Sequence, residues 1–81
     1  MIEIYTKSYC PFCWRAKDLL NRKKLDYIEM DVERDSRKWD QMVKRSGKTT
    51  VPQIIINGKA IGGFDELYKL EKNRELEKLL D

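Results

Sequence analysis

The chain contains only two cysteines, Cys10 and Cys13, and they lie where a strand pattern changes into a helix pattern. Residues 2–5 alternate apolar and polar side chains, as a short strand does. Pro11 suits the first position of a helix, because it has no N–H to lose there and its fixed φ fits the helical backbone. The sequence therefore predicts a strand and then a helix over residues 11–24, with Cys10 as the N-cap.

A C-x-x-C pair in this setting is typical of a dithiol/disulfide redox site. At an N-cap, the free amides of Phe12 and Cys13 and the positive end of the helix dipole stabilise a thiolate on Cys10. Lys7, three residues upstream, can add a positive charge nearby. Because the thiolate is the reactive form, Cys10 is the expected nucleophile. Cys13 lies on the same helical face and is the expected resolving cysteine.

Three other roles for the cysteine pair are less well supported. A structural disulfide across so short a loop gains little loop-closure entropy. A zinc site requires about four ligands, whereas the chain has no histidine and no second cysteine pair, so no metal site is predicted. Inert core cysteines are not expected on either side of a proline that starts a helix.

Length and composition indicate one small domain that spans residues 1–81. At 41% hydrophobic and 38% charged residues, the chain can build one core under a well-solvated surface. It has no apolar run of the ~18 or more residues that a membrane span requires, and no secretory signal is visible. Because the sparing use of cysteine fits a reducing compartment, we expect a cytoplasmic protein that does not associate with membranes.

The formal net charge is +3, and the basic residues are mixed with acidic ones along the chain. Nucleic-acid binding would require a one-sided basic patch with interleaved aromatic side chains. No such stripe is visible, so no nucleic-acid partner is predicted. A mildly basic surface suits small anionic substrates or an acidic protein partner.

Further elements are predicted from periodicity and turn signals. Residues 27–32 form a second strand, and the strand–helix–strand unit of this length makes the first two strands parallel. A second helix is expected with Asp35 or Ser36 as its N-cap and Gly47 as its C-terminal stop. Residues 53–56 and 59–61 then form an antiparallel hairpin around Asn57-Gly58.

The last part of the chain is predicted to be helical. Asp65 is expected to cap a third helix with Leu67, Tyr68 and Leu70 facing inward, and residues 76–80 are expected to form a final short helix. The resulting order, β-α-β-α-β-β-α, describes a mixed four-stranded sheet flanked by helices. This α/β order is that of the thioredoxin fold.

Three motifs at fixed spacings together resemble those of a known family. The motifs are Cys10-Pro11-Phe12-Cys13, Thr49-Thr50-Val51-Pro52 and Ile61-Gly62-Gly63-Phe64-Asp65. With all three in place, the chain resembles a glutaredoxin of the short bacterial dithiol kind, over essentially its whole length. The resemblance implies a glutathione-dependent thiol–disulfide oxidoreductase that uses glutathione as co-substrate and carries no bound cofactor.

The resemblance also implies how glutathione would bind. Pro52 would be cis and face Cys10, and the Val51 backbone, next to Thr50, would pair with the cysteine residue of glutathione like an added strand. The remaining contacts involve both ends of the tripeptide. Gly63, Phe64 and Asp65 would hold its γ-glutamyl end, Lys7 would meet its glycine carboxylate, and Phe12 would pack against it.

The chain departs from many glutaredoxins at three positions. Trp14 follows the second cysteine, and Phe12 replaces the more usual tyrosine. Trp39 occupies the position of a second-helix Arg or Gln that helps to bind the glycine carboxylate. Arg37 or Lys38 could substitute for that side chain. These differences bear on glutathione affinity and partner choice rather than on reaction type.

The expected partners are glutathione and proteins that carry disulfides or bound glutathione, with ribonucleotide reductase as one candidate, and a monomer is expected. Two alternatives remain. The first is a redoxin reduced by thioredoxin reductase, against which the Gly62-Gly63-Phe64-Asp65 motif argues. The second is a dimer that holds a [2Fe–2S] cluster through Cys10 and two glutathiones. Pro11 and Cys13 both argue against that cluster carrier.

Overall fold

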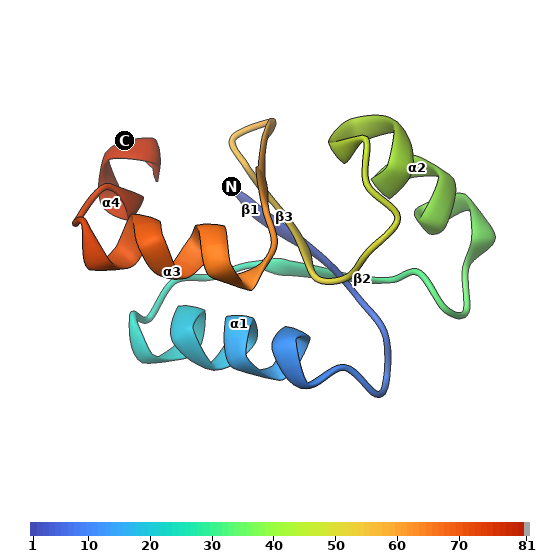
Figure 1. The fold of residues 1–81 in the computed structure, drawn as a ribbon, viewed down its shortest axis with the longest axis horizontal. Coiled ribbons are helices and arrows are strands. Elements are labelled where there is room, and N and C mark those ends of the chain that lie inside the picture. The colour runs from blue at the N-terminus through green and yellow to red at the C-terminus, as the bar shows by residue number, and fades with distance from the viewer. Residues whose placement is uncertain (81) are drawn as a thin grey trace.

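The computed structural model describes residues 1–80. Their strands and helices follow one another in the predicted order, with a short helix at the end (Figure 1). In chain order they are β1 (Ile2–Thr6), α1 (Pro11–Arg22), β2 (Ile28–Asp31), α2 (Ser36–Ser46), β3 (Gln53–Ile56), β4 (Lys59–Gly62), α3 (Phe64–Lys72) and α4 (Leu76–Leu80).

The strands form a mixed sheet in the order β2-β1-β3-β4. β1 and β2 are parallel, because α1 carries the chain back between them. β3 runs antiparallel to both β1 and β4. Asn57 and Gly58 both have positive φ, 49° and 84°, as the tight turn of a two-residue hairpin requires. The predicted four-stranded mixed sheet is confirmed.

Side-chain alternation along β1 and β3 divides the interior into two cores, one on each face of the sheet. The larger core is aliphatic and lies beneath α1, α3 and α4 (Figure 1). Its buried members are Ile2, Ile4, Ala16, Leu19, Leu20, Ile54, Ile56, Leu67 and Leu76. The smaller core lies beneath α2 and contains Tyr5, Met30, Val32, Met42 and Ile55.

The ends of the first two helices largely match the predictions. Cys10 is the N-cap of α1, with an extended backbone at φ −155° and ψ 94°, and Pro11 is the first helical residue. The helix ends at Arg22, short of residue 24, because Lys24 takes a left-handed φ of 58°. For α2, the Asp35 carboxylate caps the N-terminus and Gly47 ends the helix at φ 71°.

Two predictions about α3 are wrong. The N-cap is Gly63 rather than Asp65, because the Glu66 carboxylate accepts a hydrogen bond from the Gly63 N–H at 2.7 Å and so fixes the helix start two residues earlier. Tyr68 does not face inward: it is 51% exposed and its ring packs beside that of Phe64, 5.9 Å away between centroids. Leu67 is fully buried, as predicted.

Among residues 1–80, no helix has both the length and the apolar character needed to cross a membrane.

Candidate redox site

Cys10 and Cys13 form a disulfide at the N-terminus of α1, with their Cα atoms 5.1 Å apart. The Cys13 N–H donates a hydrogen bond to the Cys10 sulfur over 3.1 Å. Cys10 is 7% exposed, whereas Cys13 is fully buried. The two sulfurs are therefore unequal, because only Cys10 keeps any solvent exposure, and it lies at the helix end where backbone amides and the dipole favour negative charge.

The local sequence explains this geometry. Pro11 starts the helix directly after Cys10, and the Trp14 N–H donates to the Cys10 carbonyl over 3.0 Å, closing the first turn. Cys13 falls on the inner side of that turn and is buried, as are Ala16 and Leu20 further along α1. The C-x-x-C spacing thus gives one outer and one inner sulfur within bonding distance.

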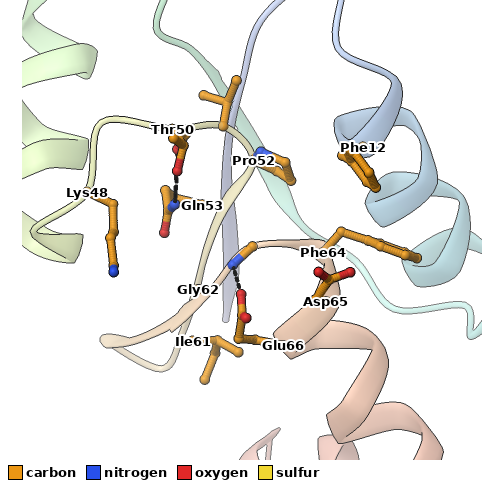
Figure 2. A pocket seen from close by; sticks show the side chains of 12 residues that line it. Phe12, Lys48, Thr50, Pro52, Gln53, Ile61, Gly62, Phe64, Asp65 and Glu66 are labelled. Atoms are coloured by element: carbon orange, nitrogen blue, oxygen red, sulfur yellow. Dashed lines mark hydrogen bonds between the residues drawn. The ribbon is translucent and has the colours of Figure 1, made fainter.

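A cavity of about 480 Å³ opens beside Phe12, the residue that precedes Cys13 in the first turn of α1 (Figure 2). Phe12 of α1 and Phe64 of α3 lie on one side of it, and Lys48 and Gln53 lie on the other. The lining includes seven of the ten predicted site residues, namely Phe12, Thr50, Val51, Pro52, Gly63, Phe64 and Asp65. Cys10, Cys13 and Lys7 do not line it.

The segment before β3 approaches the first turn of α3 in this cavity. The Val51–Pro52 peptide bond is cis, as the resemblance implies. Gln53 is 3% exposed, and its side-chain amide donates to the Thr50 carbonyl and hydroxyl over 3.0 and 3.2 Å, which fixes the bend. A Cβ at Gly63 would lie 3.4 Å from the Pro52 carbonyl oxygen, so a glycine best fits this close approach.

The N-terminus of α3 presents hydrogen-bond donors to the cavity. The Gly63 N–H already donates a hydrogen bond to Glu66, so it is not free for a ligand. The role of Gly63 is to let the backbone of another segment come close. The next amides, of Phe64 and Asp65, have no acceptor within the helix, because they belong to its first turn. The Asp65 side chain is exposed and makes no ion pair within residues 1–80. This corner can therefore bind a carboxylate and an ammonium group side by side.

Five lining residues were not among the predicted site residues: Lys48, Gln53, Ile61, Gly62 and Glu66. Ile61 and Gly62 belong to the third motif but received no role of their own. A glutamate at the third position of a helix is the second half of a capping box, and this half alone could have identified Glu66. At Gly62, φ is 121° and a Cβ would lie 2.7 Å from the Glu66 carboxylate, so the glycine makes room for that side chain. No sequence signal marks Lys48, which is exposed in the loop before Thr50.

A row of neighbouring aromatic rings runs from Phe12 of the tetrad to Phe64 and Tyr68 of α3. The ring of Phe12, 51% exposed, lies 6.2 Å from that of Phe64 between centroids, and the Arg15 guanidinium lies 5.2 Å from the centre of the Phe12 ring. On the other side of the tetrad, Tyr9 and Trp14 form an edge-to-face pair at 5.3 Å. Of these rings, those of Phe12 and Phe64 line the cavity and give it an apolar margin against which an organic disulfide can pack.

Lys7 lies away from the cavity lining, in contact with α2. Its ammonium lies 5.6 Å from the centre of the Trp39 ring, within the range of a cation–π interaction. Trp39 is half-buried and packs on the core beneath α2, as Val51 does. Arg37 points into solvent and pairs with Asp35, the cap of its own helix, at 3.5 Å.

Within residues 1–80, no three His, Cys, Asp or Glu side chains lie close enough together to hold a metal ion. The absence of a metal cofactor stays a prediction.

Comparison with known proteins agrees with this geometry. The glutaredoxin family model matches residues 2–61. The chain is 48% identical over 79 residues to glutaredoxin 3 of Escherichia coli strain K12, covering 98% of this chain and 95% of that protein. It is 44% identical over 82 residues to glutaredoxin 1 of Rickettsia prowazekii, covering 99% and 86% of the two chains.

Solved structures extend the likeness to three dimensions. The solution structure of a Brucella melitensis glutaredoxin matches with a TM-score of 0.84 at 43% identity, over 98% of this chain and 86% of that one. The crystal structure of a buckwheat glutaredoxin–glutathione complex matches with a TM-score of 0.87 at 27% identity, over 98% and 74%. The fold is therefore the thioredoxin fold. With its dithiol at a helix N-terminus, the chain belongs to the glutaredoxin family and is a glutathione-dependent thiol–disulfide oxidoreductase.

Proposed function

We propose that Cys10 is the nucleophile of this oxidoreductase and Cys13 the resolving cysteine. The observation that carries this assignment is the hydrogen bond from the Cys13 N–H to the Cys10 sulfur at the start of α1. After reduction of the disulfide, that amide and the helix dipole stabilise a thiolate on Cys10 rather than on Cys13. Cys10 also retains some exposed surface, 7% against none for Cys13, so a substrate disulfide meets Cys10 first.

For a glutathione mixed disulfide, one cysteine is enough. The Cys10 thiolate attacks the glutathione sulfur, so that a Cys10–glutathione bond forms while the substrate thiolate leaves and takes up a proton. The thiolate of a second glutathione then attacks the bound glutathione sulfur, which releases oxidised glutathione and restores the Cys10 thiolate. In the net reaction, mixed disulfide and glutathione give a free thiol and oxidised glutathione.

For a protein disulfide, both cysteines take part. Cys10 attacks one sulfur of the substrate and forms an intermolecular disulfide, and Cys13 then attacks Cys10 and releases the substrate as a dithiol. The enzyme is left with the Cys10–Cys13 disulfide, the state that the structure holds. Two glutathiones return it to the dithiol and become oxidised glutathione.

Glutathione fits the cavity with its γ-glutamyl end at α3. There the amides of Phe64 and Asp65 receive the carboxylate, and the Asp65 side chain receives the ammonium group. The Val51 backbone pairs with the central cysteine residue, next to Thr50 and Pro52, and Gly63 allows the close approach. Phe12 packs against the tripeptide, and Lys7 attracts the glycine carboxylate. The cavity lining and the buckwheat glutathione complex support this arrangement.

We further infer a monomeric cytoplasmic protein of one domain, residues 1–81, that acts on glutathionylated and disulfide-containing proteins, ribonucleotide reductase among the candidates. The family match favours neither alternative function, the redoxin reduced by thioredoxin reductase nor the [2Fe–2S] carrier.

The test is glutathione-dependent reduction of the mixed disulfide of glutathione and 2-mercaptoethanol, coupled to glutathione reductase. Cys10→Ser is expected to abolish turnover, whereas Cys13→Ser is expected to retain it and to lose activity only toward a protein disulfide. Activity that survives in Cys10→Ser would overturn the assignment. A parent enzyme that accepts electrons only from thioredoxin reductase would overturn the glutathione site.

A further inference from the structure

Lys7 and Trp39 form a contact that the proposed reaction does not explain. Lys7 lies in the loop between β1 and α1 and makes no ion pair with a carboxylate among the residues that the structure describes. Its ammonium is instead 5.6 Å from the centre of the Trp39 ring. Because Trp39 packs on the core formed by Tyr5, Met42 and their neighbours, the position of the ring is fixed by packing.

Arg37, a basic side chain of α2 close to Trp39 in sequence, pairs within its own helix. Arg37 is 91% exposed in its side chain and pairs with Asp35. Arg37 is therefore engaged within its own helix, whereas the Lys7 ammonium lies against the ring at position 39.

Glutathione carries a second carboxylate that needs a positive partner at the α2 side. Its γ-glutamyl end is assigned to α3, and Phe64 of α3 packs on the core beneath α1 and α3. Val51 and Trp39 both pack on the opposite core, beneath α2. A tripeptide that starts at Phe64 and pairs with Val51 therefore directs its glycine end from the α3 side toward the α2 side, where Lys7 and Trp39 lie.

We propose that Trp39 is a positioning residue for substrate binding, and that its ring holds the Lys7 ammonium where the glycine carboxylate of a glutathione substrate arrives. This inference rests on the proposed glutathione site. A free lysine side chain loses rotamer freedom when it binds a carboxylate, and the ring reduces that loss by restricting Lys7 before the substrate arrives. The Trp39 ring thus promotes binding of the glycine carboxylate by orienting the Lys7 ammonium, whereas a basic residue at position 39 would bind the carboxylate with its own charge.

The test measures kcat and KM for the mixed disulfide of glutathione and 2-mercaptoethanol in four variants. Trp39→Leu keeps an apolar side chain but removes the π face, and Trp39→Phe keeps a smaller ring. We expect Trp39→Leu to raise KM about two- to fivefold, the equivalent of the ~0.5–1 kcal/mol of an exposed cation–π contact. Trp39→Phe should raise KM less. Lys7→Met should raise KM at least as much as Trp39→Leu, because it removes the charge itself.

The double variant Lys7→Met/Trp39→Leu separates positioning from packing. If Trp39 acts through Lys7, the double variant has the KM of Lys7→Met alone, because the ring has no ammonium left to hold. If Trp39 only supports the fold, the two increases in KM multiply, and the inference is overturned. Thermal unfolding of each variant shows whether packing has changed as well.

Altering the substrate provides an independent test. With a mixed disulfide made from glutathione esterified at its glycine carboxylate, parent and Trp39→Leu should have the same KM, because the charge that Lys7 would meet is gone. Trp14→Leu is the matched tryptophan control, since Trp14 contacts Tyr9 rather than Lys7. Its effect should be equal for acid and ester. A Trp39→Leu effect that persists with the ester would overturn the inference.

These outcomes are distinct from a failure of the proposed function. Turnover in Cys10→Ser, or a KM that Lys7→Met leaves unchanged, would overturn the assigned site, and the role of Trp39 would fall with it. An increased KM in Lys7→Met together with an unchanged KM in Trp39→Leu would overturn only the role of Trp39.

Discussion

On one face of the sheet, α1, α3 and α4 cover a core of aliphatic side chains, whereas on the other face α2 covers a smaller core that includes the ring of Tyr5. The α2 face also carries a charged network. Arg45 donates to both carboxylate oxygens of Glu3, over 2.9 and 2.8 Å, and to the Tyr5 hydroxyl over 2.9 Å. The Tyr5 hydroxyl in turn donates to Gln41 of α2.

The difference shows how each face fixes its helices. Interlocking aliphatic side chains hold α1 and α3, and with them the dithiol and the amides of Phe64 and Asp65, through shape and burial. A lone helix over a thin core has fewer such contacts, so directional hydrogen bonds from Arg45 to Glu3 and Tyr5 define where α2 lies on the sheet. That placement also determines where Trp39 meets Lys7.

The largest effect is expected in the aliphatic core. Leu20 is fully buried between α1 and the sheet, so Leu20→Ala should lower the free energy of unfolding by about 3 kcal/mol, through lost burial and the cavity that remains. Val43 is half-buried beneath α2, so Val43→Ala should lower the free energy of unfolding by only about 1 kcal/mol. Urea denaturation followed by circular dichroism measures both. Equal losses would contradict the contrast between the two faces.

A smaller effect is expected from the network on the α2 face. Arg45→Met should lower the free energy of unfolding by about 2 kcal/mol, because the mostly buried Glu3 carboxylate and the hydroxyl of fully buried Tyr5 each lose a partner. The double variant Glu3→Gln/Arg45→Met removes the unpaired charge and should recover part of that loss. A double variant that is less stable than Arg45→Met would show that Glu3 is not the group left unpaired.

The acid dependence of stability sharpens the same contrast. The hydrogen bond from Arg45 lowers the pKa of Glu3 below its ordinary value of 4.5, and the opposing effect of burial is smaller. The ion pair therefore stabilises the fold fully above about pH 4.5, and this contribution is lost as the pH falls through the lower, folded-state pKa. We expect the stability difference between parent and Glu3→Gln to be constant near neutral pH and to shrink in acid. A difference that grows in acid would contradict this sign.

Much of the fold follows from patterns that no neighbour can override. Alternation along β1 sends Ile2 and Ile4 to one core and Tyr5 to the other, and Asn57-Gly58 admits essentially one tight hairpin turn. Because proline is favoured at the first position of a helix and disfavoured in its interior, the position of Cys10 was predictable as well.

The details that the sequence did not reveal depend on contacts between elements. Both Gly63 and Asp65 can cap α3, and the carboxylate of Glu66 decides in favour of Gly63. Tyr68 has the right spacing to face inward, yet it packs beside Phe64 on the surface. The contact of Lys7 with Trp39 joins segments far apart in the chain, so no local pattern predicts it.

The smallest effect is expected for an ion pair on the surface of α1. Arg22 and Asp18 lie one turn apart at 3.1 Å, but their side chains are 72% and 65% exposed, whereas those of Arg45 and Glu3 are 28% and 19% exposed. Water screens the exposed pair, so Arg22→Met should change the free energy of unfolding by about 0.3 kcal/mol. Urea denaturation at low and high salt measures this change beside that of Arg45→Met. If the two substitutions destabilise the protein equally, exposure does not separate the two ion pairs, and the charged network gives the α2 face no special support.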